Sequence, residues 1–302
     1  MRTPEDPLSQ VLFVAEAQAA VSTGLAARGA WALSVSPAQV LKCNVVRTGQ
    51  CWLDAGGAQW LLEAGDCFLV APGHAFVLGS DLSLPSIPAE QVFAGSGSAP
   101  FARLDGGAGA DFLSLGGRME LPASAELLTS ALPVVAVLRS DSQAAQRIGW
   151  LLDRLEEEST HISPGRAAVS SALMQLVFIE LFRGLPHVQT GGWLAALADP
   201  RLGPALQAIH REPGRSWKVS DLADVASLSR SRFARRFHDV VGRSPMDYVL
   251  HWRMALATRR LAEPGSTVAE VAEALGYSTE SAFGAAYRRA TGHSPRGQRI
   301  SR

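Results

Sequence analysis

The sequence predicts a multidomain α+β protein with an N-terminal antiparallel β-barrel, a helical segment, and a C-terminal all-α domain containing two helix-turn-helix units. Three observations predict this architecture. Short apolar runs, broken by Gly and Pro roughly every 8–12 residues, fill residues 31–115, which is typical of an antiparallel sandwich or small barrel. Helical periodicity begins near residue 140. A longer pattern then occurs twice, at residues 219–245 and 268–295.

Length and charge indicate how the chain is divided. Its 302 residues leave room for about two domains, and 47% hydrophobic residues exclude a disordered chain. We expect domains at residues 1–190 and 199–302. The net charge of zero conceals 17 Arg/Lys against 10 Asp/Glu in residues 199–302, and 11 against 18 in residues 1–198. A segment of charge +7 beside one of −7 is typical of a DNA-binding domain joined to another domain.

The N-terminal elements follow from local patterns. Residues 1–20 predict a short amphipathic helix that leads into the first domain. Turns at Gly65-Asp66 and at Pro72-Gly73-His74 bracket a predicted strand. Residues 94–111 are rich in Gly, Ala and Ser, and we interpret them as a loop.

The central segment predicts two long helices. In residues 141–158 one face is apolar, carrying Ile148, Leu151, Leu152 and Leu155. Ser163-Pro164 predicts the start of a helix over 164–184 that is apolar on most sides. Such a helix is buried between other elements or at a subunit contact, so we expect residues 140–185 to support a homodimer. Residues 193–212 predict two short helices around Asp199-Pro200.

The two C-terminal repeats share a constant register of 50 residues from Ser231 and Ser281 onward. The equivalent pairs are Phe233 and Phe283, Phe237 and Tyr287, Gly242 and Gly292, Ser244 and Ser294, and Pro245 and Pro295. Each copy predicts a short helix, a turn and a second helix, which is the form of a helix-turn-helix. Residues 245–263 between the copies predict one helix of about 27 Å.

The outward face of the second helix differs between the repeats. In the first repeat Phe233, Phe237 and Val241 predict the buried side, and Ser231, Arg232, Arg235 and His238 the exposed side. Arginine can bond a guanine edge bidentately in the major groove. In the alternative interpretation these arginines only solvate the surface of the helix, but two such units in one basic segment favour DNA binding.

In the second repeat the residue equivalent to Arg235 is Ala285. Because Gly284 and Ala285 are small, we expect this unit to hold phosphates through Arg288 and Arg289 and to read few bases. The predicted DNA-binding residues are Arg230, Ser231, Arg232, Arg235, Arg236, Thr279, Ser281, Arg288 and Arg289.

Residues 217–299 resemble the DNA-binding domain of the AraC family of bacterial transcription regulators, through WKVSDLADVASLSRSRFARRFHDVVGRSPMDYVLHWRMALA, VAEVAEALGYSTESAFGAAYRR and GHSPRGQR. The resemblance implies a sequence-specific regulator whose two units enter successive major-groove segments of promoter DNA, about one turn apart. It implies RNA polymerase as a partner if the protein is an activator. It also implies a structural role for Arg253.

Residues 30–120 resemble a cupin-like sensor domain of one AraC subgroup, through TGQCWL, LEAGDCFLVAPGHAFVL and DFLSLGGR. The resemblance implies that this domain senses a signal and modulates promoter binding. The His-x-His and Glu ligands of metal-binding cupins are missing, so we expect no bound metal or cofactor. We expect a small effector near Trp52, Trp60, Phe68, His74 and Phe76.

Two alternatives for the signal involve side-chain chemistry. Cys43, Cys51 and Cys67, with His74, are candidates for a redox-responsive or metal-responsive site. Some members of the subgroup are similar to regulators that sense reactive chlorine species, although this sequence has no cysteine near Leu25. An enzyme is disfavoured because nucleophile-elbow and phosphate-cradle patterns are missing. Without a signal peptide or a long uncharged apolar run, we expect a cytoplasmic protein with reduced thiols.

Overall fold

The computed structural model describes residues 6–97, 99–109, 111–121, 125, 129, 132–160, 163–185 and 191–296. Its elements fall into two compact units. The β unit comprises Gln18–Leu121 and Leu132–Gln189, and the helical unit comprises Met1–Ala17, Pro122–Ala131 and Thr190–Arg302. The sequence predicts domains at 1–190 and 199–302, whereas the helical unit also includes residues up to Ala17.

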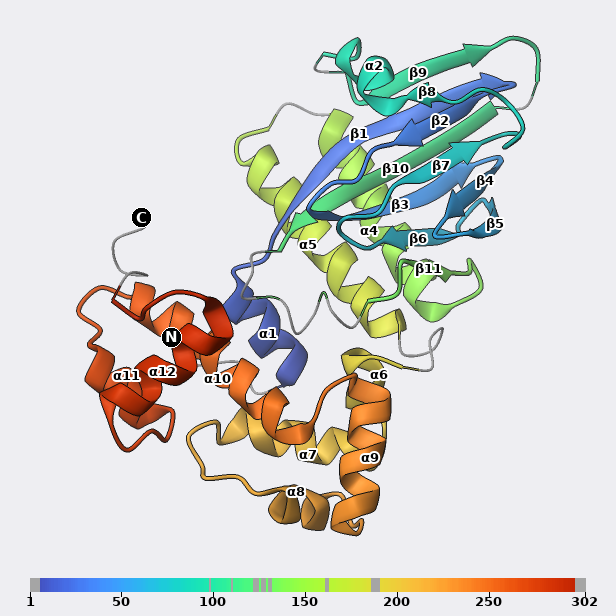
Figure 1. Cartoon of the computed structure of the whole chain (residues 1–302). Helices are drawn as coiled ribbons and strands as arrows, with labels where there is room; N and C mark the ends of the chain where they lie inside the picture. The colour runs from blue at the N-terminus through green and yellow to red at the C-terminus, as the bar shows by residue number, and fades with distance from the viewer. Residues whose placement is uncertain are drawn as a thin grey trace. The chain divides into compact units, whose positions relative to one another are not determined.

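The β unit contains two sheets that face each other (Figure 1). The six-stranded sheet A has the order β11-β6-β3-β10-β1-β9, and the five-stranded sheet B has the order β5-β4-β7-β2-β8. The strands are β1 Gln18–Gly29, β2 Ala32–Val35, β3 Val40–Thr48, β4 Gln50–Ala55, β5 Ala58–Glu63, β6 Cys67–Val70, β7 Phe76–Gly79, β8 Ile87–Pro88, β9 Phe101–Gly106, β10 Asp111–Glu120 and β11 Val135–Leu138.

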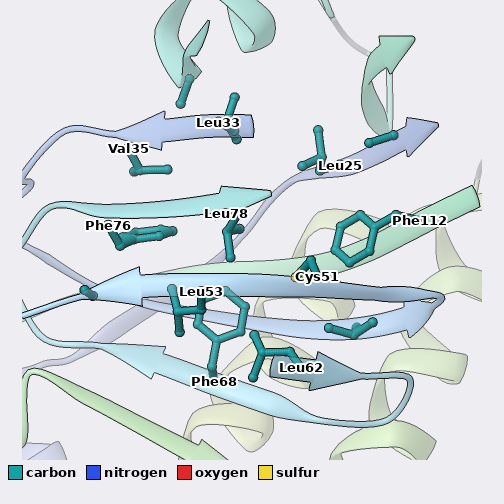
Figure 2. Packing of buried hydrophobic residues seen from close by; sticks show 14 of the residues in the cluster. Leu25, Leu33, Val35, Cys51, Leu53, Leu62, Phe68, Phe76, Leu78 and Phe112 are labelled. Carbon is teal, nitrogen blue, oxygen red and sulfur yellow. The ribbon is translucent and has the colours of Figure 1, made fainter. Parts of the chain in front are cut away.

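The core of the β unit lies between these sheets, where sheet A contributes Phe68 and Phe112 and sheet B contributes Leu33, Leu53 and Leu78 (Figure 2). The sheets are not closed into one another, so the expected barrel is corrected to a β-sandwich. Most strand pairs are antiparallel, as expected. The edge strands β9 and β8 pair parallel to β1 and β2, because long connections return the chain in the same direction.

Two long helices pack together beside sheet A. They are α4 (Gln143–Thr160) and α5 (Arg166–Gly184), and α5 also packs against β1. The apolar face predicted for α4 is confirmed, since its four named residues are all at most 5% exposed. The predicted start of α5 is wrong by two residues. Gly165 takes the N-cap with a φ of +83°, and the carbonyl of Ser163 accepts from the amide of Arg166 in the preceding turn.

The turn at Gly65-Asp66 is confirmed and has a structural role. Asp66 is buried and accepts hydrogen bonds from the backbone amides of Glu63 and Ser140 and from Arg139, at 2.7 Å. It therefore ties the β5–β6 turn to the end of β11. The expected loop over 94–111 is corrected. After α2 (Ala89–Ala94) it contains β9, whose pairing with the distant strand β1 outweighs its low strand propensity.

The helical unit contains α1 Pro7–Ala15, α6 Trp193–Ala198, α7 Leu202–Arg211, α8 Val219–Val225, α9 Arg230–Val241, α10 Pro245–Ala262, α11 Val268–Ala274 and α12 Glu280–Thr291 (Figure 1). The two short helices expected within 193–212 and the long helix between the repeats are confirmed. Ser244 caps α10 by accepting from the amide of Asp247, and Pro245 occupies the first turn.

Helix α1 belongs to the helical unit because its contacts are with α7 and α10. Gln10 accepts from the ring of His210 at 3.0 Å, and Phe13 lies 3.5 Å beneath the guanidinium of Arg259. Arg259 also donates to the carbonyl of Phe13. The expected amphipathic helix is therefore present, but it packs against helices about 200 residues away in the sequence.

Among the described helices, α5 has the length and apolar composition that could cross a membrane. One helix with those properties is weak evidence for a membrane span, because the core helix of a globular protein shares them. Because α5 packs on β1 and α4, it occupies the position of such a core helix in this fold.

Candidate nucleic-acid interface and sensor unit

The turns of the two helix-turn-helix units have the same backbone geometry. Ser227 has a φ of +53°, and Gly276 at the equivalent position has a φ of +79°. In the first turn the amide of Leu228 donates to the carbonyl of Ala223 at 2.9 Å. In the second the amide of Tyr277 donates to the carbonyl of Ala272 at the same distance. This left-handed residue ends α8 and α11 in the same way, so the sequence repeat is a structural repeat.

Aromatic residues form the core of each unit. Phe233 and Phe237 on α9 are fully buried, with ring centroids 5.6 Å apart, and Phe237 meets Tyr248 of α10 edge-on. Phe283 and Tyr287 on α12 occupy the equivalent positions, also fully buried, at 5.7 Å. These contacts fix the buried side of α9 and α12, and thereby which side faces solvent.

The solvent side of α9 carries the arginines expected from the sequence. Arg230, Ser231, Arg232 and Arg235 are all exposed. Within the described part of the chain, none of these three arginines is found in an ion pair. Their guanidinium groups are therefore available to an anionic partner.

Arg236 is also exposed but has a partner. Its guanidinium is 2.5 Å from the carboxylate of Asp199, which also accepts from the amides of Arg201 and Leu202 at the start of α7. Burial raises the pKa of Asp199, but the two amides and Arg236 together hold that pKa below its ordinary value. Arg236 thus connects α9 to α7.

The solvent side of α12 has fewer long side chains. Arg288 and Arg289 are exposed in its last turn, whereas Ala285 is exposed one turn earlier and Gly284 has open space around its Cα. Thr279 caps the helix by accepting from the amide of Ala282 at 3.1 Å, and Ser281 is exposed next to it. The cationic groups of α12 therefore lie only at its C-terminal end.

The segment before the first helix-turn-helix contacts the turn of the second one, next to Arg253 of α10. Arg253 of α10 donates to the carbonyls of Pro213 and Arg215, which precede α8, and its guanidinium lies over the ring of Tyr277 in the second unit. The structural role implied for Arg253 is confirmed by these contacts. Next to it, a Cβ on Gly276 would lie 2.1 Å from the carbonyl oxygen of Gly214. Only glycine permits this approach.

Comparisons with known proteins agree with this architecture. The Helix-turn-helix domain family matches residues 222–299, and the Cupin family matches residues 6–186. An AraC-like transcription regulator of Streptomyces lividans is 36% identical, covering 96% of this chain and 96% of that protein. A second one, of Streptomyces antibioticus, is 35% identical and covers 96% and 97%. The chain belongs to the AraC-like transcription regulators.

Among solved structures, the DNA-binding domain of AdpA in complex with a target DNA is similar, with 30% identity and a TM-score of 0.32. It covers 34% of this chain and 92% of that chain. The two family matches and the AraC-like relatives show that the regulator is a DNA-binding protein with an N-terminal cupin domain, and its helical and β units correspond to these two parts.

The predicted effector residues lie in different surroundings in this regulator. Phe68 and Phe76 are buried between the sheets and meet edge-on at 6.1 Å, and Trp60 packs against the same core. Trp52 alternates with the buried Leu53 on β4 and is 38% exposed. His74 is exposed in the turn before β7. The structure therefore brings three of these five residues together.

The three cysteines are buried thiols in two places. Cys51 lies in the sandwich core, whereas Cys43 lies opposite Gly117, where Met174 of α5 packs. Burial raises the pKa of the Cys51 thiol to about 12, and burial with the charge of Asp66 raises that of Cys67 to about 12. Burial also raises the pKa of Cys43 well above its usual value. Protonated, covered thiols react slowly, so the described residues do not support the redox alternative.

A metal site is also not assembled in the described part of the chain. No group of three or more His, Cys, Asp or Glu side chains there is placed to hold an ion. His74 is exposed whereas Cys51 lies in the core, and the described residues give the metal-responsive alternative no structural support.

Proposed function

We propose that the regulator reads promoter DNA mainly through α9 and holds it through α12. Arg232 and Arg235 of α9 are exposed and have no ion pair among the described residues, which supports direct contact with base edges. The small residues Gly284 and Ala285 support few base contacts by α12, and Arg288 and Arg289 support phosphate contacts there. The remaining residues of the proposed interface are Arg230, Ser231, Thr279 and Ser281, whereas Arg236, also predicted from the sequence, binds Asp199 and is not assigned to it.

The observation that carries this proposal is the difference between Arg235 and Ala285, which occupy equivalent positions on the second helices of the two repeats. In the experiment, duplexes bound by the full chain are selected from a random library. The affinity of the variants for the selected and scrambled duplexes is then measured. Arg235→Ala should lose about 1–3 kcal/mol of discrimination at one base pair. Arg288→Ala should weaken binding to both duplexes alike, and should reduce the slope of log affinity against log salt concentration by about 1.

The matched control is Arg236→Ala, because the Asp199 contact makes Arg236 part of the helix packing. This variant should lower the free energy of unfolding while leaving the selected sequence unchanged. If Arg235→Ala and Arg288→Ala changed the affinities for the selected and the scrambled duplex in the same way, the proposed difference between α9 and α12 would be wrong.

The β unit, in this proposal, receives a signal and modulates promoter binding. Its core includes Trp60, Phe68 and Phe76, which supply an apolar wall for a small effector, whereas Trp52 points to the opposite face of β4 and His74 is exposed in the turn before β7. We place the protein in the cytoplasm, as a regulator and not an enzyme, with RNA polymerase as a further partner if it activates transcription.

The proposal also includes a homodimer formed by α4 and α5. Trp150 on α4 is 68% exposed, and Val169 and Leu176 on α5 are 38% and 46% exposed. Large apolar side chains in water favour association. Trp150→Glu combined with Leu176→Glu should convert dimer to monomer in sedimentation equilibrium. Val225→Glu, at a comparably exposed position on α8, should leave the mass unchanged. A wild-type monomer at all concentrations would contradict this part of the proposal.

A further inference from the structure

The inner face of sheet A changes from apolar to polar along its strands. Near one end Val46 lies opposite Ser114, next to Phe112 and Leu25 of the core. Towards the other end Asn44 lies opposite Gly116, and Lys42 lies opposite Arg118. Residues directly opposite on paired strands share a face, so Lys42 and Arg118 point to the same side of the sheet.

That side is the space between the two sheets. Lys42 also lies opposite Val70 of β6, which is part of the sandwich core. The ammonium of Lys42 is 5.7 Å from the ring centroid of Phe76, on β7 of the facing sheet. Lys42 therefore extends from sheet A across to sheet B, where an aromatic ring meets its charge.

The electrostatics there leave a positive charge poorly compensated. Burial lowers the pKa of Lys42, and the charge of Glu90 on α2 partly raises it again. Within the described residues Lys42 makes no ion pair. Arg118 has Glu120 4.0 Å away and is about half exposed. Two like charges directly opposite on neighbouring strands are destabilising, so this pair favours an anion between them.

A polar donor and an apolar surface adjoin the two cations. The carboxamide of Asn44 lies over Gly116, where a Cβ would come 2.3 Å from its oxygen. Phe76 and Val70 supply the apolar surface beneath Lys42. A carboxylate accepts from a guanidinium, an ammonium and an amide, and an attached apolar body packs on aromatic and aliphatic side chains.

We infer that Lys42 and Arg118, with Asn44 beside them, form the anion-recognising end of the effector site, and that the effector is a small organic carboxylate with an apolar body lying against Phe76. The inference rests on the proposed sensing function of the β unit and names the chemical class of its ligand. The alternative role for Lys42 is packing, in which its methylene stem covers Phe76 and the ammonium stays in water.

The experiment uses the fact that Lys42 and Lys218 are the only lysines of the chain. Full-length protein labelled with carbon-13 at lysine Cε gives one methylene signal for each, and Lys42→Arg assigns them. The probes are benzoate and octanoate, with benzamide and octanamide as uncharged equivalents. At least one carboxylate should shift the Lys42 signal along a saturating curve, while the Lys218 signal and both amide titrations stay flat.

Variants separate recognition from packing. Arg118→Gln should weaken carboxylate binding about tenfold, as expected for loss of a charge-assisted hydrogen bond. Arg103→Gln, at an exposed arginine of β9, should bind as the wild type does. The inference is overturned if neither carboxylate shifts Lys42, if the amides shift it equally, or if Arg103→Gln weakens binding as much as Arg118→Gln.

DNA binding by the same labelled protein is measured separately. If the protein binds DNA while Lys42 fails to respond, only the ligand inference is lost. If Lys42 responds to the carboxylates but DNA affinity is the same with and without them, the assignment of the ligand class stands and the proposed sensing function fails.

Discussion

Arg235 and Arg236 are adjacent in the sequence but have different surroundings. Arg235 faces solvent without an ion pair in the described structure, whereas Arg236 binds the carboxylate that caps α7. The sequence predicted both as DNA contacts, because helical periodicity places both outside the buried stripe. The contact with Asp199 joins residues 37 positions apart, and helical periodicity contains no information about such a pair.

A second residue-scale feature is the buried hydrogen-bonded chain around His210. Trp193 donates to the hydroxyl of Tyr248, which lies 2.6 Å from Nε2 of His210, and Nδ1 of His210 is 3.0 Å from Gln10. The ring also stacks on Trp252 at 4.1 Å. Burial lowers the pKa of His210 to about 3. The histidine is therefore neutral in the folded protein at neutral pH.

This neutral histidine makes the stability of the helical unit depend on pH. An unfolded histidine binds a proton below about pH 6.5, but folded His210 does not until about pH 3. The stabilisation is complete above pH 6.5 and declines as the pH falls, by about 2 kcal/mol between pH 8 and pH 5. Pulse proteolysis in urea, with peptides of α7 and α10 followed by mass spectrometry, measures this loss.

The control is His210→Gln. This variant should be less stable at pH 8, by about 1–3 kcal/mol for the broken buried network, but should have a flatter profile between pH 8 and pH 5. An equally steep decline in the variant would assign the pH dependence to other groups.

At the scale of elements, the repeat made the helical unit predictable. Helix lengths, the buried stripes and the caps depend on residues three or four positions apart, which periodicity reports directly. The turn between the two helices of each repeat was predicted from the same pattern. Strand β9 and the packing of α1 were not predicted, because both depend on partners far along the chain: β1 for one, α7 and α10 for the other.

The contact between Gly214 and Gly276 gives a test of how the two units are held together. Gly276→Ala adds a Cβ that would lie 2.1 Å from a backbone carbonyl, at a φ of +79°. Gly292→Ala introduces the same kind of φ strain, at +76°, with nothing within 4 Å. The control should lose about 1–2 kcal/mol of unfolding free energy, and Gly276→Ala should lose more.

Urea unfolding curves give the unfolding free energies from their midpoints and slopes, and the affinity for a selected duplex reports the spacing of the two helix-turn-helix units. Because Gly276 lies between the two units, its variant should also lose DNA affinity beyond the fraction that is unfolded. Equal losses of stability and of affinity in Gly276→Ala and Gly292→Ala would show that the close approach does not position the second unit.

At the scale of the whole molecule, the opposite net charges of residues 1–198 and 199–302 predicted that DNA binding is confined to the C-terminal part. The basic residues 199–302 form most of the helical unit, and the acidic remainder forms most of the β unit. The sandwich in place of a barrel, and the polar end at Lys42 and Arg118, could not be predicted. They depend on which strands pair and in which register, and composition does not specify either.

The central claim is that the two C-terminal helix-turn-helix units bind neighbouring segments of one DNA duplex. Hydroxyl-radical footprinting of the full chain on a duplex selected from a random library tests it most directly. The account predicts two protected segments on one face, about one helical turn (~34 Å) apart. Only the segment under α9 should show a strong base preference. No protection on any selected duplex, or a single segment that Arg288→Ala leaves unchanged, would contradict the account.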